Sequence, residues 1–167
     1  MPKSIFAAAV CWKIEYGQPI TDNTLHFLVI QYSEEGRGGV HIKFPGGTNR
    51  KNLTETPLQT LLREFEEETY LVVEQGRDEP MFSIPKGPDH TQHFFVLDPG
   101  DYSGKLRTEV KTEIEAGRPP ERLGPPMWVS AAQLLEEMFP PHRKVLIDLL
   151  PKIKKFIEEQ RSKKESL

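Results

Sequence analysis

The chain has 167 residues and a formal net charge of −3 at pH 7, and 37% of its residues are apolar and 28% charged. These values suit one globular domain that buries a core without crosslinks. The acidic balance argues against general nucleic-acid binding, and no apolar stretch reaches the length of a membrane span. One cysteine, Cys11, allows no internal disulfide. It fits a buried residue of a cytoplasmic protein.

Three strands are predicted before the first helix. Residues 5–14 are rich in small and β-branched apolar side chains. This start superficially resembles a signal peptide, but the apolar run is too short, so we interpret it as a buried strand. Residues 25–32 predict a second strand and residues 40–44 a short third one, after a glycine-rich turn. The Pro-Gly-Gly of residues 45–47 is expected to end it.

The first helix is predicted over residues 56–69. Thr56 is its expected N-cap, Pro57 suits the first helical position, and Gln59 completes a Thr-x-x-Gln capping box. Apolar residues recur at helical spacing and predict one buried stripe. The stripe consists of Leu58, Leu61, Leu62 and Phe65.

The second half predicts strands at residues 71–73, 81–84, 93–97 and 127–129. Residues 98–127 are ambiguous. Within them, residues 106–116 alternate apolar and charged residues, which suggests a strand, yet Leu106, Val110 and Ile114 are spaced four apart, as in a helix. We favour the strand because of the threonines.

Two helices are predicted to end the chain. Ser130 caps the first, over residues 131–137, and the second covers residues 141–160 with a kink at Pro151. Residues 162–167 are expected to fray. The order of elements predicts a single α+β domain over residues 1–161, an α/β/α sandwich with a mixed β-sheet between helices.

Clustered carboxylates stand out on the first helix. At helical spacing Glu64, Glu67 and Glu68 share one stripe, whereas Glu66 points elsewhere. Like charges at this spacing repel, and the negative end of the helix dipole disfavours them further. A divalent cation such as Mg²⁺ or Mn²⁺ would compensate. Taken alone, however, the cluster also fits a solvated acidic face, which is the usual meaning of a run of Glu.

The surroundings of this helix resemble the Nudix box, G-x5-E-x7-R-E-U-x-E-E-x-G-U, in which U is a bulky apolar residue. Glu55 is followed, after seven residues, by Arg63-Glu64-Phe65-Glu66-Glu67-Glu68, and Phe44-Pro45-Gly46-Gly47 precedes it. The resemblance implies the Nudix fold and a Nudix-type diphosphate hydrolase. There are two departures: seven residues separate Gly47 from Glu55 where the family has five, and Tyr70 replaces the box glycine.

The resemblance also implies roles for individual residues. Glu64, Glu67 and Glu68 would hold Mg²⁺ or Mn²⁺, with the carbonyl of Gly46 as a further ligand. Arg63 would pair with Glu55 and hold the loop against the helix. The general base would be a glutamate of the box, such as Glu64, or one of a later loop, where Glu121 is our candidate. Its competitors are Glu109, Glu113 and Glu115.

The implied substrate is a small molecule, a nucleoside diphosphate linked to another group, either a nucleoside triphosphate or a sugar nucleotide such as ADP-ribose. Four cations flank the site and are candidates for phosphate contacts: Arg37, Lys43, Arg50 and Lys51. A monomer or a homodimer is expected. Two alternatives stay open: a Nudix-fold binding or regulatory module without turnover, which Tyr70 and the longer loop favour slightly, and an unrelated α+β domain with an acidic helix.

Overall fold

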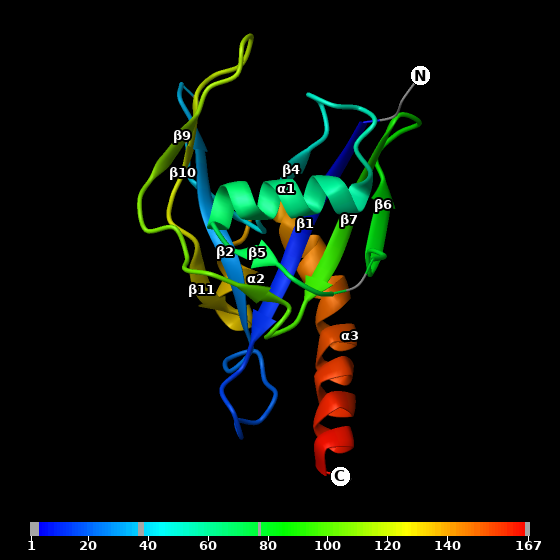
Figure 1. Ribbon diagram of the computed structural model, residues 1–167. Helices are drawn as coiled ribbons and strands as arrows, with labels where there is room; N and C mark the ends of the chain where they lie inside the picture. The colour runs from blue at the N-terminus through cyan, green and yellow to red at the C-terminus, as the bar shows by residue number, and fades with distance from the viewer. Residues whose placement is uncertain (1–3, 37–38, 77, 166–167) are drawn as a thin grey trace.

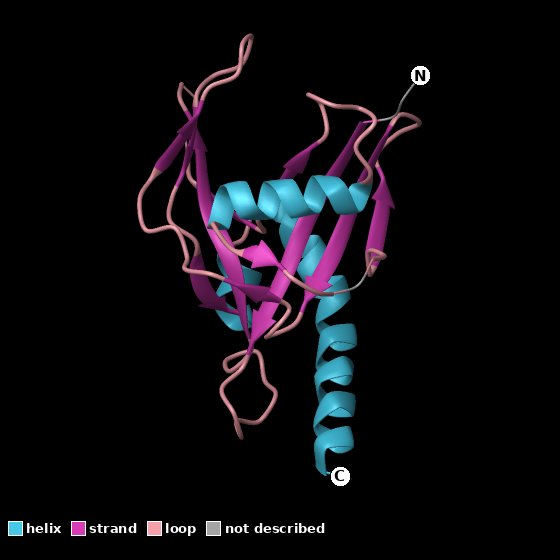
Figure 2. Ribbon diagram, in the orientation of Figure 1, coloured by secondary structure: helices cyan, strands magenta, loops and turns pink. Residues whose placement is uncertain are grey.

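A computed structural model describes residues 4–36, 39–76 and 78–165. It consists of a strongly twisted mixed sheet with helices on both faces (Figure 1). Helix α1 (Pro57–Thr69) crosses one face, and α2 (Ala131–Glu137) and α3 (Pro140–Glu165) lie on the other (Figure 2). The predicted α+β sandwich is confirmed.

Strand β1 (Ser4–Lys13) is the centre of the sheet, with β7 parallel on one side and β2 antiparallel on the other. The path of neighbours is β6-β7-β1-β2-β10-β9; β3 and β11 also pair with β2, and β4 with β1. In the described residues, β5 and β8 form a separate two-stranded sheet. The remaining strands are β2 (His26–Glu34), β3 (His41–Lys43), β4 (Gly46–Thr48), β5 (Val72–Val73), β6 (Phe82–Pro85), β7 (His90–Leu97), β8 (Tyr102–Ser103), β9 (Lys111–Glu113), β10 (Glu121–Leu123) and β11 (Met127–Ser130).

The core has two layers because side chains of β1 alternate between the faces of the sheet. Ala7, Ala9 and Cys11 pack toward α1, against Leu61 and Phe65. Ala8, Val10 and Trp12 pack on the other side, in the larger cluster that includes the buried face of α3. Burial also raises the pKa of the Cys11 thiol to about 12, so Cys11 is an inert core residue.

Helix α1 begins as predicted. The Thr56 side chain accepts from the Gln59 amide at 3.2 Å, and the Gln59 side chain accepts from the Thr56 amide at 2.9 Å. The helix ends at Tyr70, which adopts the left-handed conformation at φ 69°. The strain of a side chain there is about 1 kcal/mol, and the Tyr70 hydroxyl donates to Glu109 at 2.7 Å.

Some predicted boundaries were wrong. Gly46 and Gly47 do not simply break the chain but form β4 against β1, where a side chain at Gly46 would clash with Ala7 and Ala8. Most of residues 106–116 is neither strand nor helix; Lys111–Glu113 alone forms β9. Strands β8 and β10 were missed.

Two expectations about helices also need correction. Leu62 is 38% exposed, so it does not belong to the buried stripe of α1. Helix α3 is longer than the predicted residues 141–160 and continues through Glu165. Residues 166–167 lie outside the described residues, and Pro151 lies inside α3. Among the described residues, no helix is long and apolar enough to cross a membrane.

Candidate active site

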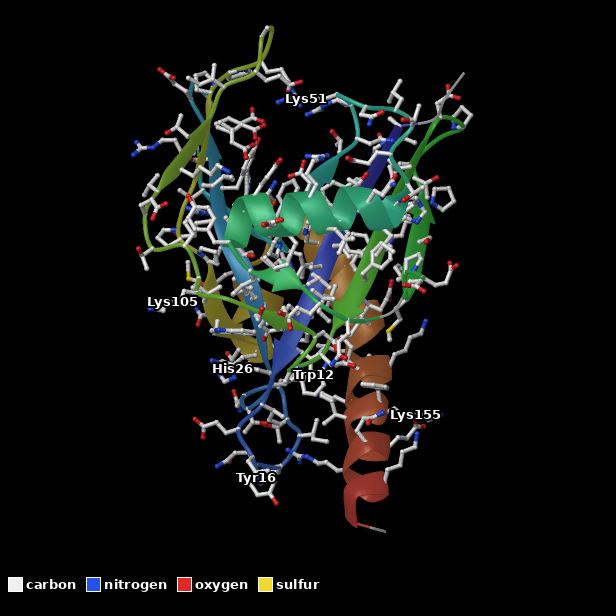
Figure 3. The ribbon with its side chains drawn as sticks, viewed as in Figure 1. Trp12, Tyr16, His26, Lys51, Lys105 and Lys155 are labelled. Atoms are coloured by element: carbon white, nitrogen blue, oxygen red, sulfur yellow. The ribbon has the colours of Figure 1, made fainter. Side chains whose placement is uncertain are left out.

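A cleft of about 710 Å³ opens beside α1. Its walls are the acidic side of α1, strand β4 with the loop that follows it, and the β9–β10 hairpin. The loop and the hairpin extend beyond α1 at the same end of the molecule, where Lys51 lies (Figures 1 and 3). Most of the predicted site residues line this cleft: Lys43, Gly46, Arg50, Lys51, Glu55, Arg63, Glu64, Glu67, Glu68 and Glu121.

Glu68 is the most deeply placed of the box glutamates. Its residue is 3% exposed, and its Oε1 accepts from the Gly46 amide at 2.6 Å. Burial raises the pKa of Glu68 to about 8, and the charges of Glu64 and Glu113 raise it further against the opposing charge of Lys43. A second positive charge near Glu68 would therefore favour its ionised form. A solvated acidic face, the other interpretation of the cluster, does not fit this burial of Glu68.

Glu64 lies against Gly47, the second glycine of β4. A Cβ atom at Gly47 would come within 2.4 Å of Glu64 Cδ, so a side chain there would displace this carboxylate. Burial raises the pKa of Glu64, and the adjacent guanidinium of Arg63, which donates to Glu64 Oε1 at 2.8 Å, lowers it. Both glycines of β4 thus help to place a box glutamate. Gly46 donates its amide to Glu68, and Gly47, without a side chain, leaves space for the carboxylate of Glu64.

The predicted pairing of Arg63 with Glu55 is present and is bidentate. Arg63 Nε donates to Glu55 Oε2 at 2.9 Å and Nη2 to Oε1 at 2.8 Å. Nη2 also donates to the carbonyl of Thr48 at 3.0 Å, which joins the end of β4 to α1. Hydrogen bonds from Arg63 lower the pKa of Glu55. Arg63 therefore fastens both ends of the lengthened loop to the helix.

Glu67 completes the acidic side of the helix. Its side chain is 45% exposed, and its Oε2 lies 3.4 Å from Arg63 Nη1. Arg63 thus contacts Glu64 and Glu67 together. Although Glu64, Glu67 and Glu68 line one cleft, no three His, Cys, Asp or Glu side chains of the described chain stand in a ready cation-binding arrangement.

Glu121 reaches the cleft from β10, opposite the helix. Its Oε1 shares the Tyr32 hydroxyl with Glu34: the hydroxyl lies 3.0 Å from Glu121 Oε1 and 2.5 Å from Glu34 Oε1. The Lys43 ammonium lies 4.1 Å from the centre of the Tyr32 ring. Of its competitors, Glu113 and Glu115 line the cleft too. Glu109 instead accepts from Tyr70 beyond the cleft wall.

The expected phosphate-binding cations are distributed around the opening. Arg50 lies 3.7 Å from Glu115, which links the loop after β4 to the β9–β10 hairpin. Arg118 also lines the cleft. It was not among the predicted site residues, because a lone arginine in a loop carries no pattern. Arg37 lies outside the described residues.

Comparison with known proteins identifies the family. The family model "NUDIX domain" matches residues 15–150, most of the chain. This chain belongs to the NUDIX family. The predicted family is therefore confirmed, and with it the Nudix-type hydrolase; an unrelated α+β domain is excluded. The family acts on small nucleotide derivatives, so the general class, hydrolysis of a nucleoside diphosphate linked to another group, follows.

Solved structures agree on the fold. A MutT NUDIX hydrolase from Burkholderia pseudomallei has a TM-score of 0.56 and 17% identity over 87% of this chain and 96% of that one. A MutT from work on Aliivibrio salmonicida and Vibrio cholerae has 0.57 and 15% over 90% and 97%. A MutT protein from Bacillus halodurans has 0.51 and 18% over 88% and 82%. At such identities these likenesses show the Nudix fold alone. No curated protein matches.

Proposed function

We propose that this Nudix protein hydrolyses a diphosphate linkage in a nucleoside triphosphate or a sugar nucleotide such as ADP-ribose, with Mg²⁺ or Mn²⁺ as cofactor. The observation that carries the proposal is the cleft in which Gly46 and Gly47 hold Glu68 and Glu64 beside Glu67. Because Tyr70 keeps the left-handed helix end, it gives no support to a binding module without turnover.

The chemistry of this donor set fits a divalent cation. Three carboxylates line the cleft, and Glu68 is buried with a pKa raised to about 8, so its ionised form needs a compensating charge. Glu64, Glu67 and Glu68 would hold the metal, with the carbonyl of Gly46 as an additional oxygen ligand. Arg63 supplies positive charge to Glu64 and Glu67 without the metal. When bound, Mg²⁺ neutralises the diphosphate and makes a water nucleophilic near neutral pH.

The cations of the cleft opening suit the diphosphate. Lys43 lies at the cleft wall between Glu68 and Tyr32, and Arg50 and Lys51 come from the lengthened loop. Because Arg50 is already paired with Glu115, an incoming phosphate would compete with that carboxylate. Arg118 offers a further charge on the hairpin side.

Glu121 is the proposed general base. It lines the same cleft as the box glutamates, and its carboxylate contacts the Tyr32 hydroxyl that it shares with Glu34. Glu113, which pairs with Glu121 from the neighbouring strand β9, is the alternative general base in the same hairpin. Glu121 would accept the proton of the attacking water, and this step needs a carboxylate that is not itself shared by the metal.

A substrate screen tests the proposal. Nucleoside triphosphates and sugar nucleotides would be incubated with the protein and Mg²⁺, and phosphate or pyrophosphate release would be scored, with alkaline phosphatase added for sugar nucleotides. Glu67→Gln is the test variant and Glu66→Gln, on the exposed side of the same helix, its matched control. We expect turnover in the wild type and in Glu66→Gln but not in Glu67→Gln. Equal turnover in all three would overturn the proposal.

A further inference from the structure

Arg107 is a fully buried cation outside the cleft. It lies between β8 and β9, and its residue is 1% exposed. Its guanidinium donates from Nε to the carbonyl of Glu68 at 2.8 Å, from Nη1 to the carbonyl of Leu123 at 3.1 Å and from Nη2 to that of Gly124 at 2.8 Å. Nη1 also donates to the carbonyl of Glu109. All four acceptors are backbone oxygens, so the side chain binds main chain from three segments.

One of those segments is the end of α1. The last four carbonyls of a helix lack partners within it. Here the carbonyl of Glu67 accepts from Lys111 Nζ at 2.9 Å, that of Glu68 from Arg107 Nε, and that of Thr69 from the Arg107 amide at 2.9 Å. The fourth of these carbonyls, that of Glu66, accepts from the Tyr70 amide at 2.8 Å. The positive charge of Arg107 also lies at the negative end of the helix dipole.

The second segment is β10 with the turn that follows it. Leu123 ends β10, the strand that carries Glu121, and its carbonyl and that of Gly124 bind the guanidinium. The amide of Gly124 in turn donates to the carbonyl of Gln31 on β2 at 2.8 Å. The side chain of Arg107 therefore links Glu68, near the end of α1, to the end of β10 on the opposite wall of the cleft.

Burying an unpaired charge is costly, so a fully buried arginine needs acceptors that replace its water. A planar guanidinium donates in fixed directions, and a lysine ammonium at the same place has one nitrogen for the same set of carbonyls. The hydrogen bonds of the Arg107 guanidinium thus fix the distance between three backbone segments, which packing of an apolar side chain at this place would not do.

We propose that Arg107 is a positioning residue that sets the separation between the box glutamates on α1 and Glu121 on β10. The inference rests on the proposed function, since it assigns the two carboxylate groups to one reaction. A misplacement of catalytic groups by about 1 Å costs about 100-fold in rate. Loss of the hydrogen bonds from Arg107 to α1 and to the end of β10 should therefore lower turnover more than substrate binding, because binding depends on the cations of the cleft opening.

The test compares Arg107→Lys with Arg161→Lys. Arg161 also donates to a backbone carbonyl, that of Gln18, but it lies near the end of α3 farthest from the β9–β10 hairpin (Figure 1). We expect Arg107→Lys to lower kcat about 10- to 100-fold with KM changed less than about threefold. In metal-free protein, amide hydrogen exchange should accelerate at Tyr70, Leu123 and Gly124, while Arg161→Lys behaves like wild type in both assays.

The hydrogen-exchange measurement does not need turnover. It therefore tests whether Arg107 links α1 to β10 even if the wild type hydrolyses no substrate and the proposed function is wrong. Unchanged exchange on β10, or a wild-type kcat in Arg107→Lys, would overturn the inference. If Arg107→Lys does not fold, Lys111→Met replaces it, because Lys111 joins the same helix end to β9 at the surface. A smaller change in the same direction supports the inference, and wild-type values of both kcat and exchange refute it.

Discussion

Replacing Glu68 by glutamine should stabilise the metal-free protein while abolishing its activity. Glu68 is 3% exposed and accepts from the Gly46 amide. Glutamine keeps an oxygen for that amide but removes the ionisable group. The variant therefore separates the structural contact of this side chain from its charge.

The magnitude follows from the pKa of Glu68, which burial raises from 4.5 to about 8. A raised pKa means that the protonated carboxyl favours the fold: the contribution is complete below pH 4.5 and disappears as pH rises through 8. At about 1.4 kcal/mol per pH unit, the loss is at most about 5 kcal/mol. For a chain of this size that is a difference of up to roughly 10–20 °C in Tm.

Thermal unfolding in chelator, recorded between pH 5 and pH 9, is the assay. The Tm of Glu68→Gln minus that of the wild type should be near zero at pH 5 and increasingly positive toward pH 9. Added Mg²⁺ should narrow the gap by stabilising the wild type, because a ligand that binds the folded state raises its stability. Glu66→Gln, with its exposed side chain, is the control. A gap that does not change with pH, or a variant less stable throughout, would refute the reasoning.

Three further predictions concern activity. Excess chelator should abolish turnover, and turnover that persists in chelator would contradict a carboxylate site that needs a cation. Glu121→Gln should lower kcat by roughly 10²–10⁴-fold with little change in KM; near-normal kcat at saturating Mg²⁺, measured beside Glu64→Gln, would move the role of base to the box or to Glu113. Gly47→Ala should displace Glu64, because a Cβ would lie 2.4 Å from its carboxyl carbon, and should lower metal affinity in a Mn²⁺ titration; unchanged affinity would mean that Glu64 is no ligand.

The parts of the fold that were predictable are those with strong local signals. The capping box at Thr56 gives the beginning of α1, and Ser130 gives that of α2. A continuous apolar run suffices for β1. In contrast, β4 and β10 are three residues long and exist because β1 and β2 offer partners, and no local pattern reports that pairing.

The candidate site was predictable to the same extent. Helical spacing placed Glu64, Glu67 and Glu68 on one side of α1, and the resemblance to the box assigned Gly46 and Arg63 to the same place. Spacing does not report depth, so it could not distinguish buried Glu68 from exposed Glu67. Arg107 was not found at all, because its acceptors are backbone carbonyls, which leave no trace in a sequence.

The central claim is water attack at phosphorus that depends on the box glutamates. Its most direct measurement is hydrolysis in ¹⁸O-labelled water with Mg²⁺, using a substrate from the screen and mass spectrometry of the phosphorylated products. The claim predicts one ¹⁸O atom on a phosphate of one product for the wild type, and no product for Glu67→Gln. Label on a carbon-bound oxygen, or equal product from Glu67→Gln, would contradict it.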